Sequence, residues 1–274
     1  MRKSTILSVA LSMGLGSALP SHAADENVDF GRPATAADVV PVVASSDGNT
    51  PSPLGATAVH TFSGGSGERS YKVEVSGEGN LVTMQWPAGV EHEFSEGYIA
   101  CYGLFTVATC ENKYASSGWG AATVTSTSPL TIVRTSTSGS LQLTQKFTAD
   151  KTEQDFLITM TLQNISRTTL NNVSLERWFH GYIDGDPNHD YGFRDASSAS
   201  IIDHHGVRLD ALTNGTVSTH VGYLGMFPEN SCGGLTADTP PPASPFNINV
   251  KVGYYFGNLS SGASKTVKFR YSRL

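Results

Sequence analysis

Cysteine is scarce in this sequence, which has only Cys101, Cys110 and Cys232 among 274 residues. Their spacing does not fit a zinc-binding pattern. In an oxidising compartment a disulfide is expected. Cys101 with Cys110 is the closest pair, and Cys232 with either partner is the alternative. One cysteine is left over in each case, as a buried thiol or as half of an intermolecular bridge.

Basic residues are few and do not cluster along the chain. Lys and Arg number 18, against 24 Asp and Glu. Because a nucleic-acid-binding protein normally presents a basic face, this balance argues against DNA and RNA as partners. It also disfavours anionic lipid, and it is compatible with cations or neutral glycans.

No hydrophobic run is long enough to span a membrane. The run from Ile6 to Leu19 is too short and is interrupted by Ser and Gly. Because Arg2 and Lys3 precede it and Ser-His-Ala23 follows it, we interpret residues 1–23 as a secretory signal peptide cleaved near Ala23. Cleavage removes two of the 18 basic residues and leaves 16 against 24 acidic ones. The sequence therefore predicts a secreted or periplasmic protein without a membrane span.

A helical period is also absent from the chain. From residue 57 onward, short apolar or alternating runs rich in Thr, Val, Tyr and Phe are separated by Gly, Ser, Asn and Pro. Such runs predict half-buried strands. The expected strands are 71–75, 81–86, 98–107, 130–133, 141–147, 156–162, 173–179, 199–202, 217–224, 246–256 and 265–271.

These runs predict an all-β fold, one large antiparallel β-sandwich of about a dozen strands over residues 57–274, with one long acidic loop between strands. Two smaller sandwiches divided near residue 150 are the alternative. Residues 24–56 are rich in Ala, Pro, Ser, Asp and Gly, which indicates a flexible N-terminal segment. Its apolar cluster, Val39–Val43, is a candidate edge strand interrupted by proline.

Two phrases, FLITMTLQNISRTTLNNV at 156–173 and GNLSSGASKTVKFRY at 257–271, carry a resemblance. Together they resemble the strand-turn-strand phrases of bacterial immunoglobulin-like surface modules. The resemblance implies a spacer or adhesive domain of an exported protein, without catalysis. The chain departs from that pattern by placing an acidic stretch between the two phrases, which suggests that the function resides there.

The acidic stretch WFHGYIDGDPNHDYGFRD, at 178–195, has oxygen-bearing side chains with nearly the spacing of a calcium loop. The candidate ligands are Asp184, Asp186, Asn188, Asp190 and Asp195. Position six of this loop is His189 rather than Gly, and position twelve is Asp195 rather than Glu. Because no helical pattern flanks it, we expect Ca²⁺ in a loop between strands. The alternative is a polar turn whose carboxylates bind backbone N–H groups.

Aromatic and histidine side chains flank the same stretch. Trp178 and Tyr182, with His180 and His189, are the candidate contact residues for a glycan or a surface protein. The alternative is that such aromatics fill the core of the sandwich. His180, His189, His204, His205 and His220 also offer nitrogen ligands for a transition metal.

Motifs for serine or metalloprotease catalysis are missing from the chain. Gly64-Gly65-Ser66-Gly67-Glu68 lacks the final glycine of a nucleophile elbow, and no His-Glu-x-x-His occurs. We therefore leave catalytic residues unassigned and favour a non-catalytic exported protein that binds Ca²⁺ and recognises an extracellular or cell-surface glycan or protein.

Two alternatives to that interpretation stay open. The first is an exported polysaccharide hydrolase or lyase that uses the same acidic and histidine-rich region. Its candidate acids, bases and ligands are His180, Asp184, Asp186 and His189, with Glu176 and Asp203 as further carboxylates. The second is a structural envelope protein with no small ligand. The sequence does not indicate the oligomeric state.

Overall fold

The computed structural model describes residues 58–103, 107–112, 116–150, 155–186, 189–223 and 248–274. The expected signal peptide, the segment 24–56 with its candidate edge strand, and Cys232 lie outside these residues. All described residues belong to one compact unit.

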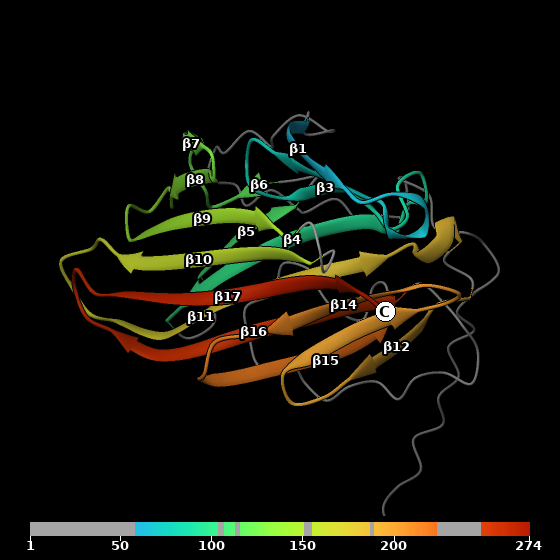
Figure 1. The fold of residues 1–274 in the computed structure, drawn as a ribbon. Coiled ribbons are helices and arrows are strands. Elements are labelled where there is room, and N and C mark those ends of the chain that lie inside the picture. Colours follow the sequence, from blue (N-terminus) through green and yellow to red (C-terminus); the bar gives the residue numbers. More distant parts are fainter. Residues whose placement is uncertain (1–57, 104–106, 113–115, 151–154, 187–188, 224–247) are drawn as a thin grey trace, which may run out of the picture. The chain divides into compact units, whose positions relative to one another are not determined.

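The described residues form 17 strands and two short 3-10 helices (Figure 1). The first half contains β1 (Ala58–Gly64), η1 (Gly67–Arg69), β2 (Tyr71–Ser76), β3 (Leu81–Gln85), β4 (Glu93–Tyr102), β5 (Val107–Asn112), β6 (Ser116–Ser117), β7 (Thr123–Thr127), β8 (Leu130–Thr135) and β9 (Leu141–Ala149). The second half contains β10 (Phe156–Asn164), β11 (Leu170–Gly181), η2 (Ile183–Gly185), β12 (Tyr191–Arg194), β13 (Ser198–Ile202), β14 (Gly206–Ala211), β15 (Thr216–Tyr223), β16 (Ile248–Leu259) and β17 (Ser264–Arg273).

The predicted all-β antiparallel sandwich is confirmed. An eight-stranded sheet has the order β12-β13-β14-β17-β10-β9-β8-β7, and a six-stranded sheet has the order β15-β16-β11-β4-β5-β6. Their apolar faces meet where the ring of Phe179 contacts Tyr271 and the ring of Tyr254 contacts Phe269. The third sheet, β1-β2-β3, joins the same core, because Phe62 of β1 packs edge-on against Phe156 of β10.

Strand alternation is visible in the burial of the side chains. Along β10 every second residue is buried, from Phe156 through Ile158 and Met160 to Leu162. This is the pattern of a strand with one face in the core. β9 and β10 pair from Phe156 with Ala149 to Asn164 with Leu141. The strands before and after residue 150, where a division into two sandwiches was the alternative, therefore belong to the same eight-stranded sheet.

The two phrases quoted above are neighbours in space. The first forms β10 and the start of β11, and the second forms the end of β16 and most of β17. β10 pairs with β17 in unbroken register, with Phe156 opposite Tyr271 and Gln163 opposite Ser264. Each phrase crosses between the sheets at the same end, where Asn164 Nδ2 donates to the carbonyl of Leu259 at 2.8 Å. The proposed likeness to immunoglobulin-like modules itself stays a prediction.

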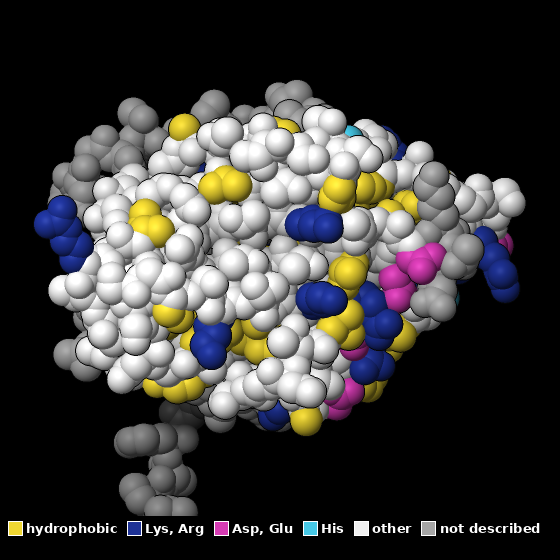
Figure 2. All heavy atoms as spheres, turned by 60° about the vertical axis from the view of Figure 1, so that its left-hand side comes forward, with side chains coloured by type: hydrophobic (Ala, Val, Ile, Leu, Met, Phe, Trp, Pro, Cys, Tyr) yellow, Lys and Arg dark blue, Asp and Glu magenta, His cyan; other side chains and the backbone are white. Residues whose placement is uncertain are grey.

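The surface in Figure 2 is mostly polar, and its apolar side chains form small separate patches. On this face Lys and Arg lie singly or beside Asp and Glu rather than in one broad basic area. No helix among the described residues is long and apolar enough to cross a membrane.

Candidate functional site: the outer face of the six-stranded sheet

Two adjacent central strands, β4 and β11, carry buried polar side chains on both of their faces. On the inner face, Arg177 Nε donates to Glu96 Oε1 at 2.7 Å, and Arg177 Nη1 donates to Gln145 at 2.9 Å. Glu96 also accepts from the Tyr271 hydroxyl and from the backbone N–H of Leu81, at 2.8 and 2.9 Å. Further hydrogen bonds therefore satisfy both members of this buried ion pair.

The opposite, outer face follows from the alternation of the strands. Because Arg177 and Phe179 point into the core, Glu176, Trp178 and His180 point outward. Register places His180 between Ser95 of β4 and Asn249 of β16. In the next row, Trp178 lies beside Lys251, and Lys251 lies beside His220 of β15. We call Ser95, Glu176, Trp178, His180, His220, Asn249 and Lys251 the polar outer face.

An outer sheet face normally lies in water, but this one is buried. Ser95, Trp178 and Asn249 are 2 to 3% exposed. Neither amide atom of Asn249, nor Ser95 Oγ, nor Trp178 Nε1 has a hydrogen-bond partner among the described residues. Buried polar groups are nearly always hydrogen-bonded, so this unmet capacity makes the face a candidate site for a polar ligand.

Charge on the polar outer face is compensated locally. Lys251 Nζ lies 3.2 Å from Glu176 Oε2, and both side chains are buried. Burial, with the positive charges of Lys251 and Arg194, lowers the pKa of His220 to about 4. His220 is therefore neutral near pH 7, and the face has no excess of positive charge.

The acidic loop joins β11 to β12 at one end of this sheet. His92, just before β4, donates from Nε2 to the carbonyl of Trp86 at 2.6 Å and accepts from the backbone N–H of Asp184 at 3.1 Å. Asp184 has a left-handed backbone, with φ of 57°, and its carboxylate pairs with the ring and the backbone N–H of His205. Burial alone would raise the pKa of the Asp184 carboxyl. The hydrogen bonds from His205 outweigh this effect, so the pKa lies below its ordinary value.

The remaining loop carboxylates have different surroundings. Asp190 is fully buried, and its Oδ1 has no hydrogen-bond partner among the described residues. Burial, with the neighbouring Asp203, Asp184 and Asp186, raises its pKa to about 8. Asp186 lies at the surface, where its Oδ2 is 2.9 Å from Nδ1 of His189. Asn188 lies outside the described residues.

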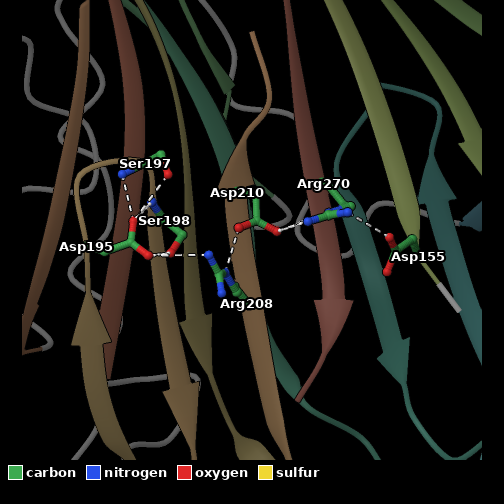
Figure 3. Close-up of polar contacts among 7 residues, drawn as sticks. All are labelled: Asp155, Asp195, Ser197, Ser198, Arg208, Asp210 and Arg270. Atoms are coloured by element: carbon green, nitrogen blue, oxygen red, sulfur yellow. Dashed lines mark hydrogen bonds and ion pairs between the residues drawn. The ribbon is translucent and has the colours of Figure 1, made fainter. Parts of the chain in front are cut away.

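Asp195 belongs to the hairpin between β12 and β13 and has other partners. Its carboxylate accepts from the backbone N–H groups of Ser197 and Ser198 at 2.7 and 2.8 Å, and it faces Arg208 at 3.3 Å. These bonds, chiefly that from Ser197, lower its pKa. Figure 3 shows that this pair begins a row of alternating charges, which continues through Asp210 and Arg270 to Asp155.

The predicted ligand sets are thus divided between several places. Trp178 and His180 lie on the polar outer face, whereas Tyr182, Asp184, Asp186, His189 and Asp190 belong to the loop. Within the part of the chain that the structure describes, no three His, Cys, Asp or Glu side chains are arranged to hold a metal ion. Calcium binding therefore stays a prediction. The cysteine pairing also stays a prediction, because the Cys110 and Cys232 side chains are not described.

Sequence reasoning missed Ser95, Lys251 and Asn249 as members of the site. The alternation of residues 247–252 predicted the strand, and period two does place Asn249 and Lys251 on one face. It does not show that this face is buried. Only the pairing of β16 with β11 brings these side chains beside Trp178 and Glu176.

Comparisons with known proteins show a similar fold but do not assign the chain to a family. No family model matches the sequence, and no curated protein matches it. The structure is similar to that of a bacterial glucoamylase complexed with acarbose, with a TM-score of 0.57 and 9% identity over 82% of this chain. The alignment covers 34% of the glucoamylase, so this chain spans about a third of its length.

A polysaccharide lyase also aligns, with a TM-score of 0.44 and 10% identity, over 76% of this chain and 33% of the lyase. That score is too low to support an argument. The likeness to the glucoamylase supports the sandwich fold and says nothing about activity.

Proposed function

We propose that this protein recognises a carbohydrate on the polar outer face of the six-stranded sheet. The observation that supports the proposal is the unmet hydrogen-bonding capacity of Ser95, Trp178 and Asn249. Their atoms include donors and acceptors. A sugar hydroxyl both donates and accepts, whereas an anion accepts only and an ammonium group donates only. The mixed set therefore fits a polyol better than an ion.

The depth of these groups and the aromatic ring of Trp178 also suit a saccharide. Ligands that meet buried groups are themselves largely enclosed, as in most small-molecule sites. The indole of Trp178 belongs to a small apolar cluster with Ile99 and Cys101 on the same face. One similar solved structure is that of a glucoamylase, a carbohydrate-active protein, which is consistent with the proposal.

Glycan binding by the purified protein tests this proposal. We expect binding on an array of microbial, plant and animal glycans, and confirmation by calorimetry with the best oligosaccharide. Trp178→Phe removes the indole N–H and keeps an aromatic ring, and Asn249→Leu removes the amide. Each is expected to weaken binding at least tenfold. Trp119→Phe is the matched control, because Trp119 is a buried tryptophan of another region.

The binding experiment also has an outcome that contradicts the proposal. Absence of binding across the array, or equal binding by the Trp178 and Trp119 variants, would show that the unmet groups do not serve a sugar. Products released from a bound polysaccharide would instead identify the protein as a hydrolase or lyase, for which Glu176 is a candidate carboxylate on this face.

Calcium binding by the acidic loop is a separate proposal. Its support is Asp190, a buried carboxyl with one oxygen unpartnered among the described residues and three other aspartates near enough to raise its pKa. A divalent cation would offset this repulsion. Calcium titration by calorimetry should give saturable binding that Asp186→Asn with Asp190→Asn abolishes. Asp195→Asn tests the predicted twelfth position, and no heat with the wild-type protein would refute the proposal.

A further inference from the structure

We infer that the saccharide bound on the polar outer face is electrically neutral, and that Glu176 sets this preference by compensating Lys251. The inference rests on the proposed carbohydrate function and narrows its ligand class. It follows from how the charges on this face are arranged. Sugar polymers that carry carboxylates or sulfates need cations, whereas neutral sugars need only hydrogen bonds and an aromatic surface.

Lys251 is the one Lys or Arg among the described side chains that alternation places on the outer face of β4, β11, β15 and β16. It is 1% exposed, and its ammonium group lies 3.2 Å from Glu176. An incoming carboxylate would have to share that ammonium with Glu176. Two carboxylates in a buried site repel strongly, because little water is present to screen them.

Glu176 is fixed in this position by its neighbours. It lies over Gly253 of β16, where an added Cβ would be 2.7 Å from Glu176 Cγ. Ser174 Oγ donates to Glu176 Oε1 at 3.4 Å on the same strand. The absence of a side chain at Gly253 therefore leaves room for Glu176 to reach Lys251.

Among the described residues, no second cation replaces Lys251 near neutral pH. His220 is its neighbour in the sheet, and the low pKa of this histidine keeps it uncharged. Arg194 acts on His220 from β12, but Arg194 is exposed. Glu93, buried two residues before Ser95, adds a carboxylate to the region rather than a cation.

Pairs of oligosaccharides that differ only at C6 test the inference. Glucan and glucuronan fragments, galactan and galacturonan fragments, and mannan and mannuronan fragments are compared by calorimetry at pH 7. We expect the wild-type protein to bind the neutral member of the pair that it recognises at least tenfold more tightly. Tighter binding of the uronate would overturn the inference and leave the carbohydrate function standing, whereas no binding to any saccharide would refute the function itself.

Glu176→Gln isolates the role of this carboxylate, because it removes one charge and keeps the shape. We expect the ratio of its affinity for the uronate to its affinity for the neutral partner to rise at least tenfold. Glu74→Gln is the matched control, because it removes a carboxylate that pairs with Lys72 at 2.8 Å on β2. Unchanged selectivity in folded Glu176→Gln protein would contradict the inference. If that variant does not fold, the wild-type selectivity alone decides.

Discussion

The two faces of β4 and β11 differ in how their buried polar groups are satisfied. On the inner face, Glu96 and Arg177 bind each other and further partners on four other strands or turns. On the outer face, Ser95, Trp178 and Asn249 are also buried, but the polar atoms of their side chains have no hydrogen-bond partner among the described residues. Burial of polar groups is therefore no sign of a binding site by itself. Among the described residues of β4 and β11, unmet hydrogen-bonding capacity distinguishes the outer face.

The largest expected effect comes from the inner face. Arg177→Met removes the guanidinium and leaves Glu96 buried without its charge partner. Breaking a buried ion pair from one side costs about 3–5 kcal/mol. Urea unfolding measures this loss, and Arg177→Met with Glu96→Gln should recover part of it. A single variant as stable as the wild-type protein would show that the inner network is not held as described.

Acid should destabilise the protein through the outer face. The pKa of His220 is about 4 in the folded protein and near 6.5 when unfolded, so between these values the unfolded chain binds more protons. Stability from this group is complete above about pH 6.5 and falls toward pH 4, by at most about 1.4 kcal/mol per pH unit. Unfolding at several pH values, compared with His220→Gln, measures it. Identical slopes for both proteins would contradict the prediction.

A smaller effect is expected at the hairpin of Asp195. This exposed carboxylate accepts backbone N–H groups of Ser197 and Ser198, as a capping side chain does. Asp195→Ala should therefore cost about 1 kcal/mol, a value typical of lost caps. The contribution of Arg208 is small, because exposed ion pairs stabilise little. Arg208→Ala is the control and should change the melting temperature less.

The smallest effect on stability is expected from Asn249→Leu. An apolar side chain of similar size removes two buried polar atoms that have no partner among the described residues, which is neutral or stabilising within about 1 kcal/mol. Thermal unfolding without ligand measures this. A loss comparable to that of Arg177→Met would show that Asn249 is satisfied within the protein, and the contrast between the two faces would disappear.

The sequence predicted the architecture because period-two alternation is a local signal. Long strands such as β9, β10 and β17 contain runs of apolar side chains at alternate positions, and each was predicted within a few residues. Short or polar strands were missed, which explains why about a dozen were expected and 17 are present in the described residues. β7, for example, is TVTST and is largely exposed, so its pairing with β8 decides its conformation.

The site was less predictable, because it depends on pairing between distant strands. Ser95 and Asn249 flank His180 only after β4, β11 and β16 align. The acidic spacing of 184–195 suggested one ligand set. Spacing cannot show that Asp195 follows β12 and lies in the hairpin between β12 and β13, apart from the loop that holds the other carboxylates. Trp178 and His180 were selected from the sequence, and the structure places both on the polar outer face.

β17 lies between β14 and β10, so it joins two parts of the eight-stranded sheet whose strands all precede it in the chain. The hydroxyls of Thr161 and Thr266 meet at 2.8 Å although 105 residues separate them. Such distant pairings form slowly. Until β17 arrives, β10 and β14 each present an open edge on which other strands can pair. During synthesis a chain that already contains β10 and β14 is therefore prone to aggregate until β17 becomes available.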